Sequence, residues 1–389
     1  MTTIVQKNRL EVVDSLRGFA IMAIMLLHSI EHFNFYVFPP AENQAAWLTA
    51  LDQRVWDSLF FLFGGKGYAI FALLFGFTYS LMYRKQLAQG KDFSWRFFWR
   101  LILLAAFALL NGAFFPGEIL SLYAMLGSVL ILVRKWSPKA LLVAAAFCLL
   151  QPLEWWHYIQ ALTQDDFTMA KAHSWQYWSL LKEGQLGESF FQLIKTNTRY
   201  GHLVTFWWSL EVGRTVQTAG LFILGYYLGL KDRFVLTARS VLFWKRIAMV
   251  AILLFIPLYF LESHFDLLYT EQVYRRTLLR AIDMYANLAF TFMMVSAFIL
   301  LYRQHWFHTL ASGLRYPGRM SLTAYVLQSM VGSFVFYGYG LSLGPQVRHS
   351  ISFGIGLVLW LLMFYFFKWW VKTYGQGPLE RLWHRLTWL

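Results

Sequence analysis

The sequence predicts an all-α fold, a polytopic membrane helical bundle of about ten transmembrane helices with both termini in the cytoplasm. Three observations predict it. Of the 389 residues, 58% are hydrophobic and only 14% are charged, whereas a soluble domain carries about 25% charged residues. Aromatic residues make up 20%, and Trp and Tyr are enriched where a membrane meets water. Lys and Arg occur in short blocks between apolar stretches rather than on one polar face.

The apolar stretches place the individual helices. A helix needs roughly 20 apolar residues to cross about 30 Å of hydrocarbon. Such stretches predict spans at 15–37, 58–82, 97–115, 118–134, 138–156, 216–230, 245–261, 281–302, 319–339 and 350–371. The second contains Gly64-Gly65-Lys66-Gly67, so we expect a break or a re-entrant turn there. The first lacks a small-x-small cleavage site and is interpreted as a retained helix rather than a signal peptide.

The connections between spans set the expected orientation. Most Lys and Arg residues fall on alternate connections, as the positive-inside rule predicts for cytoplasmic loops. We therefore expect a multi-pass protein of the bacterial inner membrane. It should form one integral membrane domain, 1–389, in which 157–215 is an extracytoplasmic interfacial segment. These loops account for the net charge of +14, so nucleic acid is not an expected partner.

The first span carries the first candidates for chemistry. Arg17 and His28 are eleven residues apart, so both project from one helix face, roughly 16 Å apart along the axis. Asp14 and Arg17 suit an N-cap and a positive-inside anchor as well as substrate binding. His28 lies deep in the membrane, where an ionisable group is costly, so we expect it to line a functional cavity. His32, with Glu31 beside it, suits either substrate binding or a solvated interface.

Two further charged residues are expected at the depth of His28. Lys66 lies within the second span, and Glu118 lies at the turn between the third and fourth spans. An imidazole, an ammonium and a carboxylate at one depth would support proton transfer. We therefore predict His28, Lys66 and Glu118 as catalytic residues. A Lys–Glu pair that only holds helices together stays an alternative, because buried charges need partners.

The second half of the chain adds fewer candidates. Tyr325 and Gln328 lie within the ninth span, although a Gln there is more often an interhelical hydrogen bond. Glu211 and Arg214 stand three residues apart and predict an interfacial ion pair. No metal-ligand cluster, nucleotide-binding glycine loop or nucleophile elbow appears, so no metal is expected. The predicted substrate-binding residues are Asp14, Arg17, His32, Tyr325 and Gln328.

Several longer motifs together resemble one family. They are Asp14-Ser-Leu-Arg17-Gly-Phe-Ala20, Gly65-Lys66-Gly67 through Gly76, Gly117-Glu118-Ile119-Leu120 with Tyr123-Ala124, Gly318-Arg319-Met320 with Gln328-Ser329 and 336–340, and Gly377-Pro378-Leu379-Glu380. Over nearly its whole length the chain resembles the YeiB-like family of bacterial inner-membrane proteins, whose domain is named only as one of unknown function.

That family in turn resembles the transmembrane acyltransferase superfamily. Its O-acetyltransferases carry an Arg-x10-His motif in the first helix, which is the spacing of Arg17 and His28. The resemblance implies transfer of an acyl group from a cytoplasmic donor, acyl-CoA, to an acceptor within or across the membrane. In this hypothesis Arg17 holds the phosphates of the donor and His28 acts as general base. Lys66 or a backbone donor stabilises the oxyanion, and Glu118 orients Lys66 or His28.

Two other functions stay open. A transporter of a small solute would use His28, Lys66 and Glu118 as a proton- or solute-coupled pathway. A non-catalytic structural or lipid-binding membrane protein would use them only to hold helices together. The expected partners are membrane lipid, an acyl donor and a sugar or lipid acceptor, with a homodimer as a further alternative. A wet cavity that joins Arg17 to His28 favours acyl transfer, and a dry, salt-bridged core favours the structural role.

Overall fold

The computed structural model describes residues 10–33, 35–164, 166–169 and 171–389, and every regular element in this part is a helix. The first elements are α1 (Glu11–Ile30), η1 (Ala41–Asn43), α2 (Ala46–Phe63), α3 (Lys66–Leu87), α4 (Ser94–Phe114), α5 (Leu120–Leu126), α6 (Ser128–Val133), α7 (Pro138–Leu149) and α8 (Pro152–Thr163). Next come α9 (Ser174–Leu186), α10 (Phe190–Thr196), η2 (Asn197–Gly201), α11 (His202–Glu211), α12 (Arg214–Leu230) and α13 (Ala238–Ser263). The last are η3 (Phe265–Leu267), α14 (Gln272–Tyr274), η4 (Arg275–Leu279), α15 (Arg280–Leu301), α16 (His305–Ala311), η5 (Ser312–Leu314), α17 (Arg315–Arg319), α18 (Ser321–Phe336), η6 (Gly344–Gln346), α19 (His349–Tyr374) and α20 (Pro378–Thr387).

The helices confirm the predicted class, because the described chain is all-helical and several of its helices fit a membrane. Six helical segments are long and apolar enough to cross it, and a seventh is added if α7 and α8, which meet at 46°, count as one span. The chain is thus a multi-pass membrane protein. By length and composition, fewer than the expected ten helices qualify as membrane spans. The apolar stretches 120–133 and 321–336 form shorter helices, and α12 has only 17 residues.

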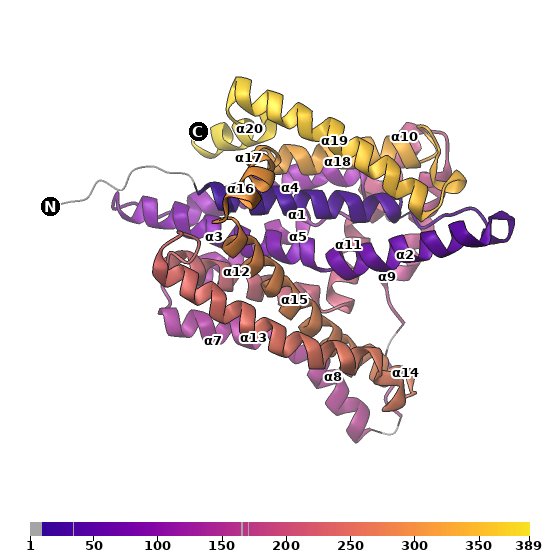
Figure 1. Cartoon of the computed structure of the whole chain (residues 1–389), viewed down its shortest axis with the longest axis horizontal. Helices are drawn as coiled ribbons and strands as arrows, with labels where there is room; N and C mark the ends of the chain where they lie inside the picture. Colours follow the sequence, from indigo (N-terminus) through magenta and orange to yellow (C-terminus); the bar gives the residue numbers. More distant parts are fainter. Residues whose placement is uncertain (1–9, 34, 165, 170) are drawn as a thin grey trace.

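Helix α1 lies at the centre of the bundle, and α13 lies at its periphery (Figure 1). In an apolar 18-residue stretch of α1, 78% is buried inside the protein, against 17% in such a stretch of α13. The outward face of α13 carries Leu253, Ile256 and Phe260, each more than half exposed, as expected of side chains that contact lipid. The polar residues of α1 are therefore held inside protein.

Glycines allow two pairs of helices to approach closely. A Cβ on Gly18 of α1 would lie 1.9 Å from the carbonyl oxygen of Leu314, and one on Gly318 would lie 1.8 Å from that of Asp14. Between α3 and α12, a Cβ on Gly76 would lie 2.0 Å from the carbonyl oxygen of Phe222. Small residues at such contacts are how membrane helices gain packing without a hydrophobic driving force.

The predicted break in the second span is confirmed. Helix α2 ends at Phe63 and α3 begins at Lys66, with Gly65 between them in the left-handed conformation at φ +73°. That conformation costs other residues energy but not glycine. Helix α2 begins at Ala46, well before the expected start at residue 58.

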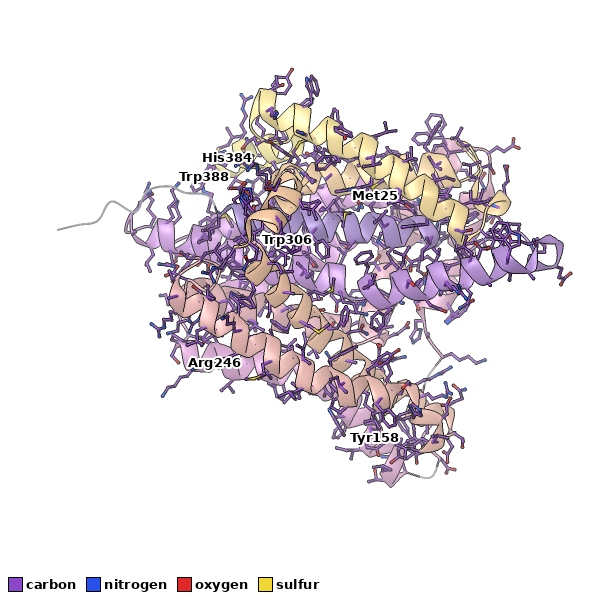
Figure 2. The ribbon with its side chains drawn as sticks, viewed as in Figure 1. Met25, Tyr158, Arg246, Trp306, His384 and Trp388 are labelled. Carbon is purple, nitrogen blue, oxygen red and sulfur yellow. The ribbon has the colours of Figure 1, made fainter. Side chains whose placement is uncertain are left out.

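The two ends of the bundle differ in content. The start of α1, together with α16, α17 and α20, lies at one end (Figure 1). The side chains of His384 and Trp388 lie at this end, whereas Tyr158 of α8 lies towards the other (Figure 2). Helices α9, α10 and α11, from the predicted interfacial segment 157–215, gather near the last turns of α1 (Figure 1). These last turns carry His28, so the candidate site lies there.

Candidate functional site

A cavity of about 650 Å³ lies beside the last turns of α1. Its walls come from α1, the α2–α3 break, the segment before α5, and helices α9, α11 and α12. Most of the lining is apolar or aromatic, for example Ile24, Leu27, Phe63, Trp175 and Trp178. The volume falls in the usual range of small-molecule sites, which are largely apolar with a few placed polar groups.

His28 contributes one of those polar groups. Its Nδ1 lies 2.8 Å from Oε2 of Glu31, one turn further along the chain. The hydroxyl of Tyr36 donates to the other oxygen of Glu31 at 2.8 Å. With Nδ1–H donated to Glu31, Nε2 of neutral His28 carries the lone pair.

The Nε2 atom of His28 is free to meet a ligand. The ring lines the cavity, and Nε2 makes no hydrogen bond to any residue that the structure describes. The rings of Phe33 and Phe115 pack against His28 at centroid distances of 5.8 and 5.1 Å. A carboxylate behind the imidazole and aromatic walls beside it hold the ring in one orientation, as a general base requires.

Glu118 lines the same cavity but is more fully engaged. It is 0% exposed, and its carboxylate accepts hydrogen bonds from the backbone N–H groups of Leu120 (2.6 Å) and Ser121 (3.2 Å) at the start of α5. Nδ1 of His202 lies 3.7 Å from its Oε1. Tyr325, also in the lining, accepts a hydrogen bond from the backbone N–H of Ile119 at 3.3 Å. Glu118 therefore fixes the backbone that shapes one wall.

Two cations line the cavity, Arg214 and the exposed Lys182. The ion pair predicted between Arg214 and Glu211 is wrong. Glu211 instead accepts a hydrogen bond from the Ser174 hydroxyl at 2.6 Å. The guanidinium of Arg214 lies between the rings of Tyr68 and Trp208, 4.5 Å from each centroid. The sequence misled because α11 ends at Glu211 and α12 begins at Arg214, with Gly213 at φ +70° between them, so the two residues do not share a helix face.

A second, smaller cavity of about 240 Å³ adjoins the first. The two share Gly65, Tyr68, Trp208 and Arg214 in their linings. The rest of the smaller lining is rich in polar groups, namely Gln217, Arg280, Asp283 and Asn287. Arg214 thus stands where an apolar space meets a polar one.

Lys66 does not join His28 and Glu118, so the expected meeting of all three side chains does not occur. It is buried, at 6% exposure, but lines neither cavity. Its ammonium lies over the rings of Phe61 and Phe290, at 5.9 and 5.5 Å. The carboxylates that act on it are Asp283 and Glu262, on α15 and α13. Lys66 thus lies outside the cavity that His28 and Glu118 line, so a similar predicted depth did not bring the three side chains together.

The other end of α1 holds Asp14 and Arg17 in a network of contacts. Asp14 accepts from Arg17 at 3.2 Å and lies 3.5 Å from Nε of Arg319. Arg17 also donates to the hydroxyl of Thr78 at 3.0 Å. Neither Asp14 nor Arg17 lines the cavity that holds His28. The cavity that holds His28 therefore does not extend to Arg17.

His32 and Gln328 lie outside both cavity linings. His32 is fully buried; its Nδ1–H donates to the carbonyl of Val37 at 3.1 Å and its Nε2 accepts from the Ser352 hydroxyl at 2.6 Å. Burial lowers the pKa of His32 to about 4, so the ring is neutral. Gln328 is 1% exposed, and its Oε1 has no partner among the described residues.

Sequence reasoning underrated Glu31 and missed the stacked role of Arg214. The signal for Glu31 was present, because a residue three positions after His28 faces the same side of a helix. No local signal marks Arg214, since Tyr68 and Trp208 come from other helices. Within the described residues no group of three His, Cys, Asp or Glu side chains is placed to hold a metal ion.

Comparisons with known proteins agree with the resemblance in the sequence. Residues 228–389 match the family described as "Protein of unknown function (DUF418)". The chain is 27% identical to "Uncharacterized protein YxaH" of Bacillus subtilis, over 98% of this chain and 95% of that protein. It is 37% identical to "Uncharacterized protein YeiB" of Escherichia coli over 18% of each chain. No solved structure matches the chain.

The two matches cover different parts of the site. The family model begins at residue 228, after α12 has passed the cavity, and so includes Asp283 and Tyr325 but neither His28 nor Arg214. The similarity to YxaH spans nearly the whole chain and therefore includes both ends of α1.

Proposed function

We propose that this chain, which is similar to the YeiB-like family, is an acyltransferase-like enzyme of the bacterial inner membrane. It transfers an acyl group from a cytoplasmic acyl thioester, acyl-CoA, to an acceptor within or across the membrane. One observation carries the proposal: His28 lines a cavity with its Nδ1 held by the buried Glu31 at 2.8 Å. A carboxylate–imidazole pair of this kind prepares a base for nucleophilic attack.

The reaction assigned to this pair is simple. Nε2 of His28 takes the proton of an acceptor hydroxyl while the acceptor oxygen bonds to the thioester carbonyl carbon. The carbon–sulfur bond then breaks, and the leaving thiolate takes the proton back from the imidazolium. Glu31 stabilises the transient imidazolium and keeps its orientation. Glu118 is a positioning residue for the wall of the cavity, and no step is assigned to Lys66.

The donor is proposed to bind at the other end of α1. Arg17 and Arg319 place two positive charges there, and guanidinium groups suit the phosphates of such a donor. Asp14 holds both cations in place. The thioester of a donor bound here has to travel along α1 to reach His28, roughly 16 Å away.

The topology proposed for this reaction keeps ten spans with both termini in the cytoplasm. Each predicted span overlaps a helix, and the short helices α5, α12 and α18 lie within the bundle (Figure 1). The start of α1 and helix α20 lie at the same end of the bundle (Figure 1), which supports an even number of crossings. Labelling of Ser137→Cys and Ser179→Cys with an impermeant reagent tests it, each in a chain whose native Cys148 is replaced by Ser. Only Ser179→Cys should react from outside.

Acyl transfer is tested with the purified full-length protein in detergent. Labelled acetyl-CoA is supplied with total bacterial membrane lipid, and loss of the thioester and label in the lipid fraction are followed. We expect both, and we expect neither with His28→Ala. His264→Ala is the matched control, because His264 is an exposed histidine on α13's end. Equal turnover by the His28→Ala variant would remove the proposed base.

Transport of a small solute is the second candidate, and the surroundings of Lys66 favour it. A buried ammonium flanked by Asp283 and Glu262 inside the bundle is the kind of group that marks ion pathways. Proteoliposomes that accumulate a proton-coupled solute with no acyl donor present would support transport over acyl transfer. Loss of that uptake in Lys66→Met but not in His28→Ala would assign the two groups to separate tasks.

A further inference from the structure

Arg214 is a cation without a charged partner inside the bundle. No carboxylate among the described residues lies within 4.0 Å of its guanidinium. The nearest candidate in sequence, Glu211, is bonded to Ser174. Asp283, which acts on Arg214 electrostatically, is bonded to the amide of Asn287 at 2.6 Å. A charge held in an apolar interior requires a counter-ion.

The position of Arg214 is set by its backbone. It is the first residue of α12, directly after Gly213, which has φ +70°. A Cβ on Gly213 would lie 3.0 Å from side-chain oxygens of Gln151 and Glu154, so both conformation and space favour glycine there. The N-terminus of this 17-residue helix adds partial positive charge beside the guanidinium.

The stacking of Arg214 presents its hydrogen-bond donors to the cavities. The rings of Tyr68 and Trp208 lie 4.5 Å from the guanidinium carbon. Within the described part of the chain, no acceptor hydrogen-bonds to the guanidinium N–H groups. A planar guanidinium held in this way offers paired donors at its edge, the geometry that a phosphate or carboxylate accepts. Arg280 adds a second positive charge in the adjoining cavity.

The larger cavity supplies the complementary surface. Beyond Arg214 its walls are formed by side chains such as Leu27, Phe63, Leu122 and Trp178, which suit an aliphatic chain. Tyr36 interacts electrostatically with Arg214 and donates a hydrogen bond to Glu31, the partner of His28. An anion on Arg214 would therefore sit close to the His28 pair.

From this arrangement we propose that Arg214 binds the oxyanion of an anionic amphiphile, a phosphate or carboxylate carried on an apolar chain that fills the 650 Å³ cavity. We further propose that this amphiphile is the acceptor whose hydroxyl faces His28, a clause that rests on the proposed acyl transfer. The chain is held by burial of its methylene groups, and the oxyanion by the fork of the guanidinium.

Binding is measured on the delipidated full-length protein in a neutral detergent, with no acyl donor. The probes are 1-oleoyl lysophosphatidic acid, oleate, monooleoylglycerol and inorganic phosphate. Lysophosphatidic acid and monooleoylglycerol share a chain and differ by the phosphate, so we expect the first to bind about tenfold tighter or more. Oleate should bind in the same Arg214-dependent way if a carboxylate suffices. If it does not, the oxyanion is assigned to phosphate.

Two variants test the residue itself. Arg214→Gln should abolish the preference for the charged lipid, whereas Arg239→Gln, at an exposed arginine at the start of α13, should retain it. If Arg214→Gln does not purify as a folded protein, Arg214→Lys takes its place. The lysine keeps the charge but lacks the planar fork, so we expect it to lower the preference about threefold or more.

Three results would overturn the proposal: equal binding of the neutral lipid, an unchanged preference in the Arg214 variants, or full competition by inorganic phosphate at the concentration of the lipid, which would mean an adventitious ion only. Because no donor is present, lipid binding can succeed while acyl transfer fails. Conversely, acylation of a neutral lipid that does not depend on Arg214 would support the proposed acyl transfer and contradict the proposed anionic acceptor.

Discussion

Helix α1 carries polar residues at both of its ends, and the two ends are built differently. At the closed end, defined here by Asp14, Arg17, Thr78 and Arg319, the charged groups bond to one another and glycines bring α1 against α17. At the cavity end, defined by His28, Glu31, Tyr36 and Arg214, one ring nitrogen and one guanidinium face open space.

The difference separates two uses of charge within a membrane protein. Buried groups that satisfy each other hold helices in register, and removing one of them leaves the other uncompensated. Groups that keep an unused donor or acceptor beside a cavity lose little stability when removed, because their remaining function concerns a ligand. Substitutions at the closed end should therefore act mainly on stability and on donor binding, and substitutions at the cavity end mainly on the chemical step.

The largest effect is expected on activity at the cavity end. Replacing His28 with Gln removes the proposed base and should reduce acyl transfer by about 10²–10⁴-fold. The temperature of unfolding should change little, because only the contact to Glu31 is lost. Turnover and thermal unfolding are measured on the same preparation. If His28→Gln unfolds at a lower temperature but keeps the wild-type rate of acyl transfer per folded molecule, His28 serves stability rather than activity, and the proposed roles of the two ends are reversed.

The largest effect on stability is expected at the closed end. Asp14 is 3% exposed and serves two guanidiniums, so Asp14→Ala should cost about 3–5 kcal/mol in the free energy of unfolding. Denaturant unfolding in detergent micelles measures it. Asp92→Ala is the control, because Asp92 is an exposed carboxylate near the same end. A loss below 1 kcal/mol for Asp14→Ala would show that this network is weakly coupled to folding.

His32 follows α1 and hydrogen-bonds to Ser352 of α19. The dependence of stability on pH tests the burial of this histidine. Burial lowers the pKa of His32 from 6.5 to about 4. The folded state thus binds its proton more weakly than the unfolded state, so this contribution to stability is present above pH 6.5 and is lost as the pH falls towards 4. The loss amounts to about 3 kcal/mol. His32→Gln should lack this part of the pH dependence between 7 and 4, and identical curves for the two proteins would contradict it.

The sequence alone predicted the class of this fold because composition is a global property. The scarcity of charge and the repeated apolar stretches require helices that satisfy their own backbone in lipid. The break at Gly64-Gly65 was also predictable, since glycine is needed where φ is positive. The number of crossings was less accessible, because short apolar helices such as α5 and α18 count as spans only in the context of their neighbours.

Within the site, what could be predicted depended on whether the partners share a helix. His28 was assigned to a cavity from its depth, and Glu31 stands on the same helix face. Depth alone could not place Lys66, because residues at one depth in the membrane can project from any face of their helix. Nor could spacing reveal that Arg214 lies between Tyr68 and Trp208, since that contact depends on how three helices pack.

The smallest effect is expected from one hydrogen bond at the closed end. The hydroxyl of Thr78 accepts from Arg17 at 3.0 Å and donates to the carbonyl of Leu74 at 2.7 Å. Thr78→Val keeps the shape of the side chain and removes the acceptor, which should cost about 1 kcal/mol because Arg17 retains Asp14. Thr78→Ser keeps the hydroxyl and should lose less. Acyl transfer should stay within about twofold in both variants, since Thr78 lines neither cavity. A large loss of activity with normal stability in Thr78→Val would instead mean that Asp14 alone does not hold Arg17 in the orientation that donor binding requires.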